Sequence, residues 1–263
     1  MSLPAILMIH GMWSRPSTFT RLRAELEAAG IRSAAVTLPH HDLPPGAPAP
    51  AALGALRLSD YVAALEREAA ALEGPVVVLG HSMGGLLAQL VSETVQPSGL
   101  VLLSTAPSAQ AAAFGTALSA ASLRTMWGVT GHWGWWNEPT LIGEEASRAG
   151  VFNGVPEAEI RPALAELTWD SGAVLAEIAA PFLDPDKGSR VDYARLRMPA
   201  LVIAGLEDRI VPAAVSRRTA RLLAGSGGRV DYEEWPNVGH WLFHDAVRPK
   251  LASAVSRFVA SLG

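Results

Sequence analysis

The sequence predicts an α/β protein built on a doubly wound, mostly parallel sheet of about six strands. Two observations support this fold class. Short aliphatic runs such as 76–79 alternate with longer segments of helical periodicity such as 58–72, which is the pattern of strands joined by crossover helices. The strand-like runs are apolar throughout, as expected where helices cover both faces of a parallel sheet.

Composition narrows the class of protein further. The 263 residues suffice for one α/β domain with an insertion, and 49% hydrophobic with 17% charged residues is a globular composition. The net charge of −4 includes no block of like charges, so a nucleic-acid partner is not expected. Cysteine is absent, which excludes disulfides and thiolate chemistry. No stretch approaches about 20 apolar residues and no basic leader is present, so we expect a cytoplasmic protein without a membrane span.

The first part of the chain contains four predicted strands with helices between them. The apolar run 5–9 is the first strand, and because only four residues precede it, we expect no N-terminal hairpin. Residues 17–29 form an amphipathic helix that Gly30 ends. The segments predicted next are strand 31–38, surface loop 39–50, helix 58–72, strand 76–79 and strand 99–104.

The proline-rich loop contains the adjacent histidines His40 and His41, followed by Asp42. Histidines beside an aspartate suggest a metal site. Adjacent side chains in extended backbone point in opposite directions, however, so we interpret the pair as part of a solvated turn.

Residues 108–193 interrupt the alternation with helical patterns at 109–127, 140–149, 157–167 and 171–180. We interpret them as a helical cap inserted into a core formed by residues 1–107 and 194–263. Pro156 and Pro162 cannot both lie inside one regular helix, so a broken or restarted helix is expected there. The alternation then resumes with strand 200–204, a helix opened by Pro212, an edge strand at 229–235 and a closing helix at 247–262.

Residues 75–89 read PVVVLGHSMGGLLAQ, which predicts a strand, a sharp turn and a helix. Ser82 stands between Gly80 and Gly84. A serine on a tight strand-to-helix turn brings the residues two positions before and after it close together, and a Cβ on either would crowd the turn. The helix that follows directs its free N–H groups and positive dipole end at the serine.

The run Gly80-His81-Ser82-Met83-Gly84 resembles the nucleophile elbow of the α/β-hydrolase family, and this resemblance makes Ser82 the candidate nucleophile. The order Ser82, Asp208, His240, each in a loop after its own strand, is similar to the order of that family's catalytic triad. Such a serine needs a base, and the base needs an acceptor that holds its tautomer. His240 fits the first role and Asp208 the second, with Glu207 as the competing acid.

The same resemblance implies two backbone N–H donors for the oxyanion, from Met83 after the nucleophile and from Met12 after the first strand. This chemistry requires no cofactor and no metal. The remaining histidines are interpreted as structural, with His10 and His81 supporting the two active-site loops.

The candidate pocket residues are aromatic. Trp13 and Trp241 flank the catalytic motifs, and Trp133, Trp135 and Trp136 cluster in the insertion. These indoles either wall an apolar cleft or attach the cap to the core. The predicted function is hydrolysis of a carboxylic ester, thioester or lactone of a small to medium apolar small molecule, through an acyl-enzyme.

Acyl transfer, amide hydrolysis, C–C cleavage or perhydrolysis at the same triad are the alternatives, because this fold supports all of them. A serine rather than an acid at position 82 argues against dehalogenase or epoxide hydrolase chemistry, which in this family resembles an Asp-nucleophile pattern. A ligand-binding receptor is a further alternative, but a pure binder has no physical need for three catalytic groups. The sequence leaves the acyl group, the alcohol and the oligomeric state open.

Overall fold

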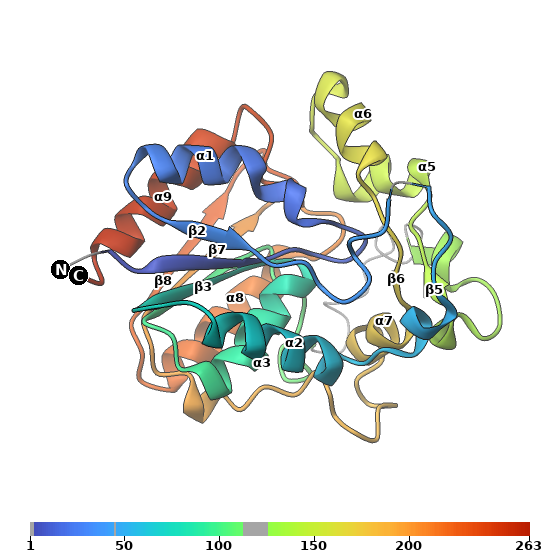
Figure 1. Cartoon of the computed structure of the whole chain (residues 1–263), viewed down its shortest axis with the longest axis horizontal. Helices are drawn as coiled ribbons and strands as arrows, with labels where there is room; N and C mark the ends of the chain where they lie inside the picture. The colour runs from blue at the N-terminus through green and yellow to red at the C-terminus, as the bar shows by residue number, and fades with distance from the viewer. Residues whose placement is uncertain (1–2, 45, 113–125) are drawn as a thin grey trace.

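The computed structural model describes residues 3–44, 46–112 and 126–263. In this part of the chain, six parallel strands form one sheet in the order β2-β1-β3-β4-β7-β8 (Figure 1). The predicted doubly wound parallel sheet is therefore confirmed. The strands are β1 (Ala5–Ile9), β2 (Ser33–Ala35), β3 (Val76–His81), β4 (Gly99–Leu103), β7 (Ala200–Gly205) and β8 (Val230–Trp235).

Helices cover both faces of the sheet, with α1 and α9 on one face and α2, α3 and α8 on the other (Figure 1). The four inner strands are buried along their whole length, which explains their uninterrupted apolar runs. A separate hydrophobic cluster fills each side of the sheet. The helices are α1 (Thr20–Ala28), α2 (Leu58–Ala70), α3 (Met83–Val95), α8 (Ala213–Gly225) and α9 (Arg248–Ala260).

The two edge strands differ from the inner ones. β8 is only partly buried, which confirms the predicted edge position of this charged strand. β2 is much shorter than the predicted 31–38, because it pairs with β1 through three residues only. The first predicted helix begins as a 3-10 turn, η1 (Pro16–Phe19), before α1, and it ends at Gly30, whose φ is +78°.

The segment between β4 and β7 carries short elements (Figure 1). Two strands of two residues each pair antiparallel, and they are too short to produce a periodic signal in the sequence. The predicted helix 109–127 falls mostly on 113–125, outside the described residues. The elements are η3 (Trp135–Asn137), β5 (Pro139–Thr140), α5 (Glu144–Ala146), the π-helical turn η4 (Ser147–Val151), α6 (Glu157–Ala165), β6 (Asp170–Ser171), α7 (Gly172–Ala179) and η5 (Tyr193–Arg195).

The expectation of a broken helix at the two prolines is wrong, because α6 runs continuously past Pro162. Pro156 lies outside the helix as its N-cap, in extended backbone with ψ at 140°. Only Pro162 has to be accommodated, and it is exposed. The one backbone hydrogen bond that it removes therefore leaves a carbonyl that water can reach.

The sheet order places a crevice beside the middle of the sheet. After β1 the chain passes to the edge strand β2 and returns to β3 on the other side of β1. Loops that follow β1 and β3 therefore meet at the carboxyl edge of the sheet, at a topological switch point. This is the position where doubly wound sheets bind their ligands.

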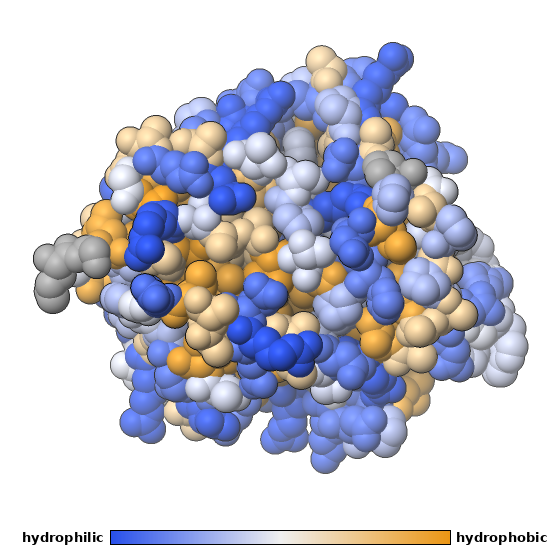
Figure 2. Space-filling view, viewed as in Figure 1, coloured by the Kyte–Doolittle hydropathy of each residue, from blue (hydrophilic) through white to orange (hydrophobic). Residues whose placement is uncertain are grey.

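The face in Figure 2 mixes hydrophilic and hydrophobic side chains, with hydrophilic ones gathered along its lower edge. Within the described ranges, no helix is both long and apolar enough to cross a membrane. The exposed large hydrophobic side chains of these ranges are Trp127, Trp133, Leu141, Phe182, Leu183 and Leu206.

Candidate active site

Ser82 occupies the sharp turn between β3 and α3, with φ at 54° and ψ at −123°. Positive φ is uncommon for a residue with a Cβ and marks strained backbone. A Cβ on Gly80 would lie 2.0 Å from the carbonyl oxygen of Gly84, and one on Gly84 would lie 2.1 Å from that of Ile9. The predicted close approach of the two glycines is thus confirmed, and the turn pushes the serine side chain out of the sheet.

The two loops that carry the oxyanion candidates meet at this turn. A Cβ on Gly11 would lie 3.0 Å from the Cβ of Ser82, so the backbone that leads into Met12 passes directly beside the serine. Met83 is the first residue of α3, where no carbonyl of the same helix reaches its N–H. Both backbone positions therefore lie beside Ser82.

His240 and Asp208 form a closely held pair in the loops after β8 and β7. Nδ1–H of His240 donates to Oδ2 of Asp208 at 2.7 Å, and the two side chains are 3% and 1% exposed. The other carboxylate oxygen accepts the backbone N–H groups of Ile210 and Val211, each at 2.8 Å. Glu207, the competing acid, is exposed. In a neutral imidazole this hydrogen bond selects the tautomer with the proton on Nδ1 and leaves Nε2 as the acceptor nitrogen.

His81 holds the backbone of this histidine in place. Its Nε2–H donates to the carbonyl oxygen of His240 at 2.9 Å, and the two rings lie 4.9 Å apart. Burial, and then the nearby ring of His240, lower the pKa of His81 to about 3. His81 is consequently neutral at physiological pH and acts as a fixed donor.

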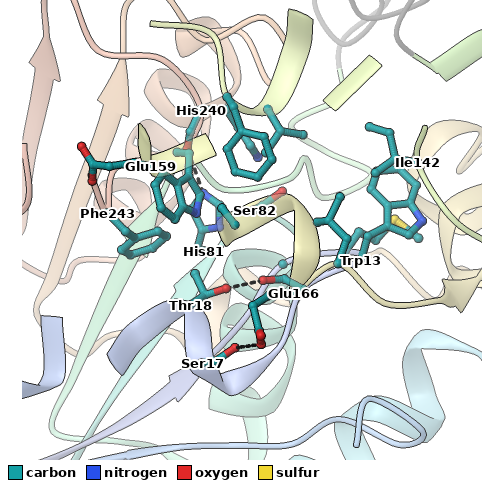
Figure 3. A pocket seen from close by; sticks show the side chains of 18 of the residues that line it. Trp13, Ser17, Thr18, His81, Ser82, Ile142, Glu159, Glu166, His240 and Phe243 are labelled. Carbon is teal, nitrogen blue, oxygen red and sulfur yellow. Dashed lines mark hydrogen bonds between the residues drawn. The ribbon is translucent and has the colours of Figure 1, made fainter. Parts of the chain in front are cut away.

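A cavity of about 270 Å³ opens between these loops (Figure 3). Ser82 and His240 both line it, without a direct hydrogen bond between their side chains. Such contacts are often long in an empty site and tighten when substrate binds. Figure 3 shows Trp13 and Ile142 on one side of the serine and Phe243 on the other.

The segment between β4 and β7 supplies one wall of the cavity. Its apolar contributors come from different short elements and face the serine loop from outside the sheet. A polar group of side chains forms another part of the lining, and in it Ser17 donates to Oε2 of Glu166 at 2.9 Å. The apolar wall residues are Ile142, Val151, Phe152, Pro162, Ala163 and Leu167, and the polar ones include Ser17, Thr18, Thr20, Arg21, Glu159 and Glu166.

The predicted pocket tryptophans separate into two groups. Trp13 and Trp241 line the cavity, next to the candidate catalytic residues. Trp133, Trp135 and Trp136 are not among the described residues that line it, so the interpretation of this cluster as the pocket wall is wrong. Trp133 is 89% exposed, and its ring contacts that of Trp136, whereas Trp135 packs against the apolar cluster that contains Trp13.

The interpretation of His40 and His41 as a solvated turn is wrong for His41, whose side chain is fully buried. Its Nε2–H donates to Oδ2 of Asp170 at 3.2 Å, and its Nδ1–H donates to the carbonyl oxygen of Pro39 at 3.0 Å. Burial alone would lower the pKa of His41, but the charge and hydrogen bond of Asp170 outweigh it and raise the pKa. His41 is therefore a buried cation.

Nothing in the sequence indicates this pair, because Asp170 lies 129 positions after His41 in a two-residue strand. Two further contacts of Asp170 are also remote in sequence. Tyr61 O–H in α2 donates to its Oδ1 at 2.8 Å, and the N–H of Trp13 donates to its Oδ2 at 3.1 Å. Among the described residues, no three histidine or acidic side chains are grouped so that they could hold a metal ion.

The doubly wound sheet, with a strained serine at its carboxyl edge and a histidine–aspartate pair in the later loops, defines the α/β-hydrolase fold. Residues 6–252 match the alpha/beta hydrolase family, and the chain belongs to this family. A comparison with curated protein sequences gives no significant match.

Solved structures of similar fold include several hydrolases. A pyrethroid hydrolase from Sphingobium faniae shares 22% identity with a TM-score of 0.71, over 98% of each chain. A methylesterase from Arabidopsis shares 15% identity with a TM-score of 0.69, over 98% of this chain and all of the other. A monoacylglycerol lipase from Paleococcus ferrophilus shares 18% identity with a TM-score of 0.67, over 100% of this chain and 97% of the other. At these identities the similarity establishes the fold.

Proposed function

We propose that the protein is a serine hydrolase that cleaves carboxylic esters of small to medium apolar molecules through an acyl-enzyme. One observation carries this proposal. The strained Ser82 and His240 border the same largely apolar cavity, and His240 is hydrogen-bonded to Asp208 from a third loop. A nucleophile and a proton acceptor on one cavity, with a carboxylate that orients the acceptor, are the groups that acyl transfer needs.

In this mechanism Nε2 of His240 takes the proton of Ser82 as Oγ attacks the ester carbonyl carbon. The resulting imidazolium is stabilised by Asp208, whose other oxygen is held by two backbone N–H groups and cannot turn away. The imidazolium then gives its proton to the leaving alkoxide, and the alcohol departs. Water repeats the two steps on the acyl-enzyme, and the carboxylic acid is released.

The N–H groups of Met12 and Met83 are the proposed oxyanion donors. Ser82 lies between the two loops that carry them, so an oxyanion on the attacked carbon would face both. Losing one such donor typically reduces kcat by about 100- to 1,000-fold. The N-terminus of α3 adds the positive end of its dipole at the same position.

We propose that residues 108–193 act as the cap of a core formed by residues 1–107 and 194–263. Supporting this, the described part of the segment contributes the apolar side chains opposite the serine. The cavity of about 270 Å³ favours a short or medium acyl or alcohol group. The names of the similar structures, a pyrethroid hydrolase, a methylesterase and a monoacylglycerol lipase, agree with an ester substrate.

Labelling and turnover together test the reaction. A fluorophosphonate probe should attach to Ser82, and p-nitrophenyl butyrate should be hydrolysed. Ser82→Ala and His240→Ala should each lower kcat by about 10⁴-fold or more, and the double variant should be barely slower than either single one. A folded wild-type protein that neither labels nor hydrolyses any ester would point to a binding protein instead.

Acyl-chain length tests the proposed apolar pocket. Because each buried CH₂ contributes about 0.8 kcal/mol, kcat/KM for p-nitrophenyl esters should rise about three- to fourfold per methylene until the pocket is full, and then fall. Phe152→Ala, in the cavity wall, should move the optimum to longer chains. Trp133→Ala removes a larger ring at an exposed position outside the described lining and should leave the optimum unchanged.

A further inference from the structure

Asp170 is a fully buried carboxylate whose two oxygens accept four hydrogen bonds. Oδ1 accepts from Tyr61 O–H at 2.8 Å and from the N–H of Ser171 at 2.7 Å. Oδ2 accepts from His41 at 3.2 Å and from the backbone N–H of Trp13 at 3.1 Å. The carboxylate belongs to β6, in the proposed cap, whereas Trp13 belongs to the loop that follows β1. It therefore connects the cap directly to the loop of the proposed oxyanion donor.

Trp13 is held in an uncommon backbone conformation. Its φ is +56°, a conformation that is unfavourable for a bulky side chain and persists only where neighbouring groups enforce it. Asp170 accepts its N–H, and the N–H of Thr168 donates to its carbonyl oxygen at 3.0 Å. Its indole N–H donates to Oγ1 of Thr140 at 3.2 Å. All three partners come from the segment between β4 and β7.

The peptide on the other side of Met12 is held by the same buried group of side chains. Nδ1–H of His10 donates to the carbonyl oxygen of Gly11 at 3.0 Å, and the ring of His10 lies 4.9 Å from that of His41. A trans peptide is planar, so fixing this carbonyl also fixes the opposite direction of the N–H of Met12. Both peptide planes that flank Met12 are thus restrained, one through His10 and the other through Asp170.

Stability alone does not account for this arrangement. A buried ion pair is often no more stabilising than apolar side chains of the same volume, because both charges must be removed from water. The His41–Asp170 pair has no exposed side-chain surface. An apolar pair, however, could not accept a hydrogen bond from the N–H of Trp13 and so could not orient the loop around it.

We propose that Asp170, supported by His41, is a positioning residue. It fixes the Met12–Trp13 peptide and, together with the hydrogen bond from His10 to Gly11, keeps the N–H of Met12 directed toward the oxyanion. This proposal rests on the proposed ester hydrolysis. Asp170 touches no reacting atom in it, and acts through the Met12–Trp13 peptide. Its loss should therefore lower kcat while leaving KM nearly unchanged, because donor alignment matters most in the transition state.

The proposal is tested by measuring kcat per active site. Titration with a fluorophosphonate gives the number of reactive serines in each preparation. Asp170→Ala removes the acceptor of the Trp13 N–H and should reduce kcat about 10- to 100-fold, since small displacements of catalytic groups have effects of this size. Asp170→Asn keeps one acceptor oxygen and should rescue part of that loss. Affinity for a trifluoromethyl ketone, which forms a tetrahedral adduct with serine, should fall in parallel with kcat/KM.

Tyr61→Phe is the matched control, because it removes a bond to the same carboxylate at the oxygen that does not contact Trp13. It should lower the melting temperature and change kcat per site less than about twofold. If Asp170→Ala does not fold, Thr140→Val takes its place, and by freeing the Trp13 ring it should lower kcat at least about threefold.

Two outcomes separate the proposals. If the folded wild-type protein is neither labelled nor active, both the proposed function and this inference are contradicted. A labelled and active wild type, with unchanged kcat per site in both Asp170→Asn and Thr140→Val, would remove this inference alone.

Discussion

Two histidine–aspartate pairs of nearly equal burial lie in this molecule, and their surroundings give them different properties. In the His240–Asp208 pair the second ring nitrogen of the histidine has no hydrogen-bond partner among the described residues, and the ring lines the cavity. In the His41–Asp170 pair the second ring nitrogen donates to Pro39, so both positions of the ring are occupied by acceptors. One ring nitrogen of His240 is therefore open to a substrate group, whereas both ring nitrogens of His41 are engaged as donors.

The comparison shows that a histidine beside an aspartate does not by itself indicate a catalytic base. What distinguishes the two pairs is the acceptor on the far side of the ring and the space beyond it. One pair faces a cavity that can admit a substrate, whereas the other is enclosed by α2, β6 and the loop after β1. We therefore expect loss of the first pair to affect mainly the reaction. Loss of the second should lower the stability of the folded state and reduce kcat by a smaller factor.

The largest expected effect concerns the acid of the first pair. Asp208→Asn should lower kcat by about 10⁴-fold, because the amide no longer holds the proton of His240 on Nδ1. Glu207→Gln, the adjacent and exposed acid, should remain near wild type. Steady-state rates on p-nitrophenyl butyrate decide between them, and the reverse result would assign the orienting role to Glu207.

Disrupting the second pair should lower the free energy of unfolding more than disrupting the first. His41→Ala leaves the buried carboxylate of Asp170 without its cation and should lower the free energy of unfolding by about 3–5 kcal/mol. His240→Ala should lower it by at most about 2 kcal/mol, because Asp208 keeps two backbone donors beside a cavity that water can enter. Urea unfolding at pH 7 measures both, and equal losses would contradict the distinction between the pairs.

The smallest expected effect is a pH dependence of the free energy of unfolding that arises from the neutral histidines His10 and His81. Burial, and then the charge of His41, lower the pKa of His10 to about 3 from an unfolded value near 6.5. The unfolded chain therefore binds a proton that the folded chain does not. The resulting stability is present above about pH 6.5 and is lost as pH falls toward 3.

From pH 7 to 5 this loss amounts to about 2 kcal/mol for His10, and His81 should behave alike. His41, with its raised pKa, acts in the opposite direction, since its contribution is lost as pH rises through its folded pKa. His10→Asn keeps a donor for Gly11 but cannot titrate. Its unfolding free energy should drop about 2 kcal/mol less than that of wild type between pH 7 and 5. Equal drops in the two proteins would show that His10 is charged in the folded state.

Most of the core was predictable because its signals are local. The apolar run at 76–79 and the glycines around Ser82 reflect burial and crowding within a few residues, and both appear in the structure as predicted. Strand order was not predicted, because the alternation of strands and helices restricts the possible crossovers without selecting a single order. The order of Ser82, Asp208 and His240 indicated which side chains to bring together, although their distances depend on the fold.

The sequence by itself determined the fold class and the serine turn, since each depends on neighbouring residues or on a regular period. It indicated the candidate catalytic residues through the resemblance of their motifs and chain order to those of the α/β-hydrolase family. Tertiary structure alone decided that Trp133 faces solvent, that Pro162 continues a helix and that His41 is buried as a cation. These outcomes depend on partners more than 100 positions away or on space left by other elements, as with Asp170 and Trp13. A single sequence carries no periodic signal for such contacts, because burial of a polar side chain is decided by the groups that fold around it.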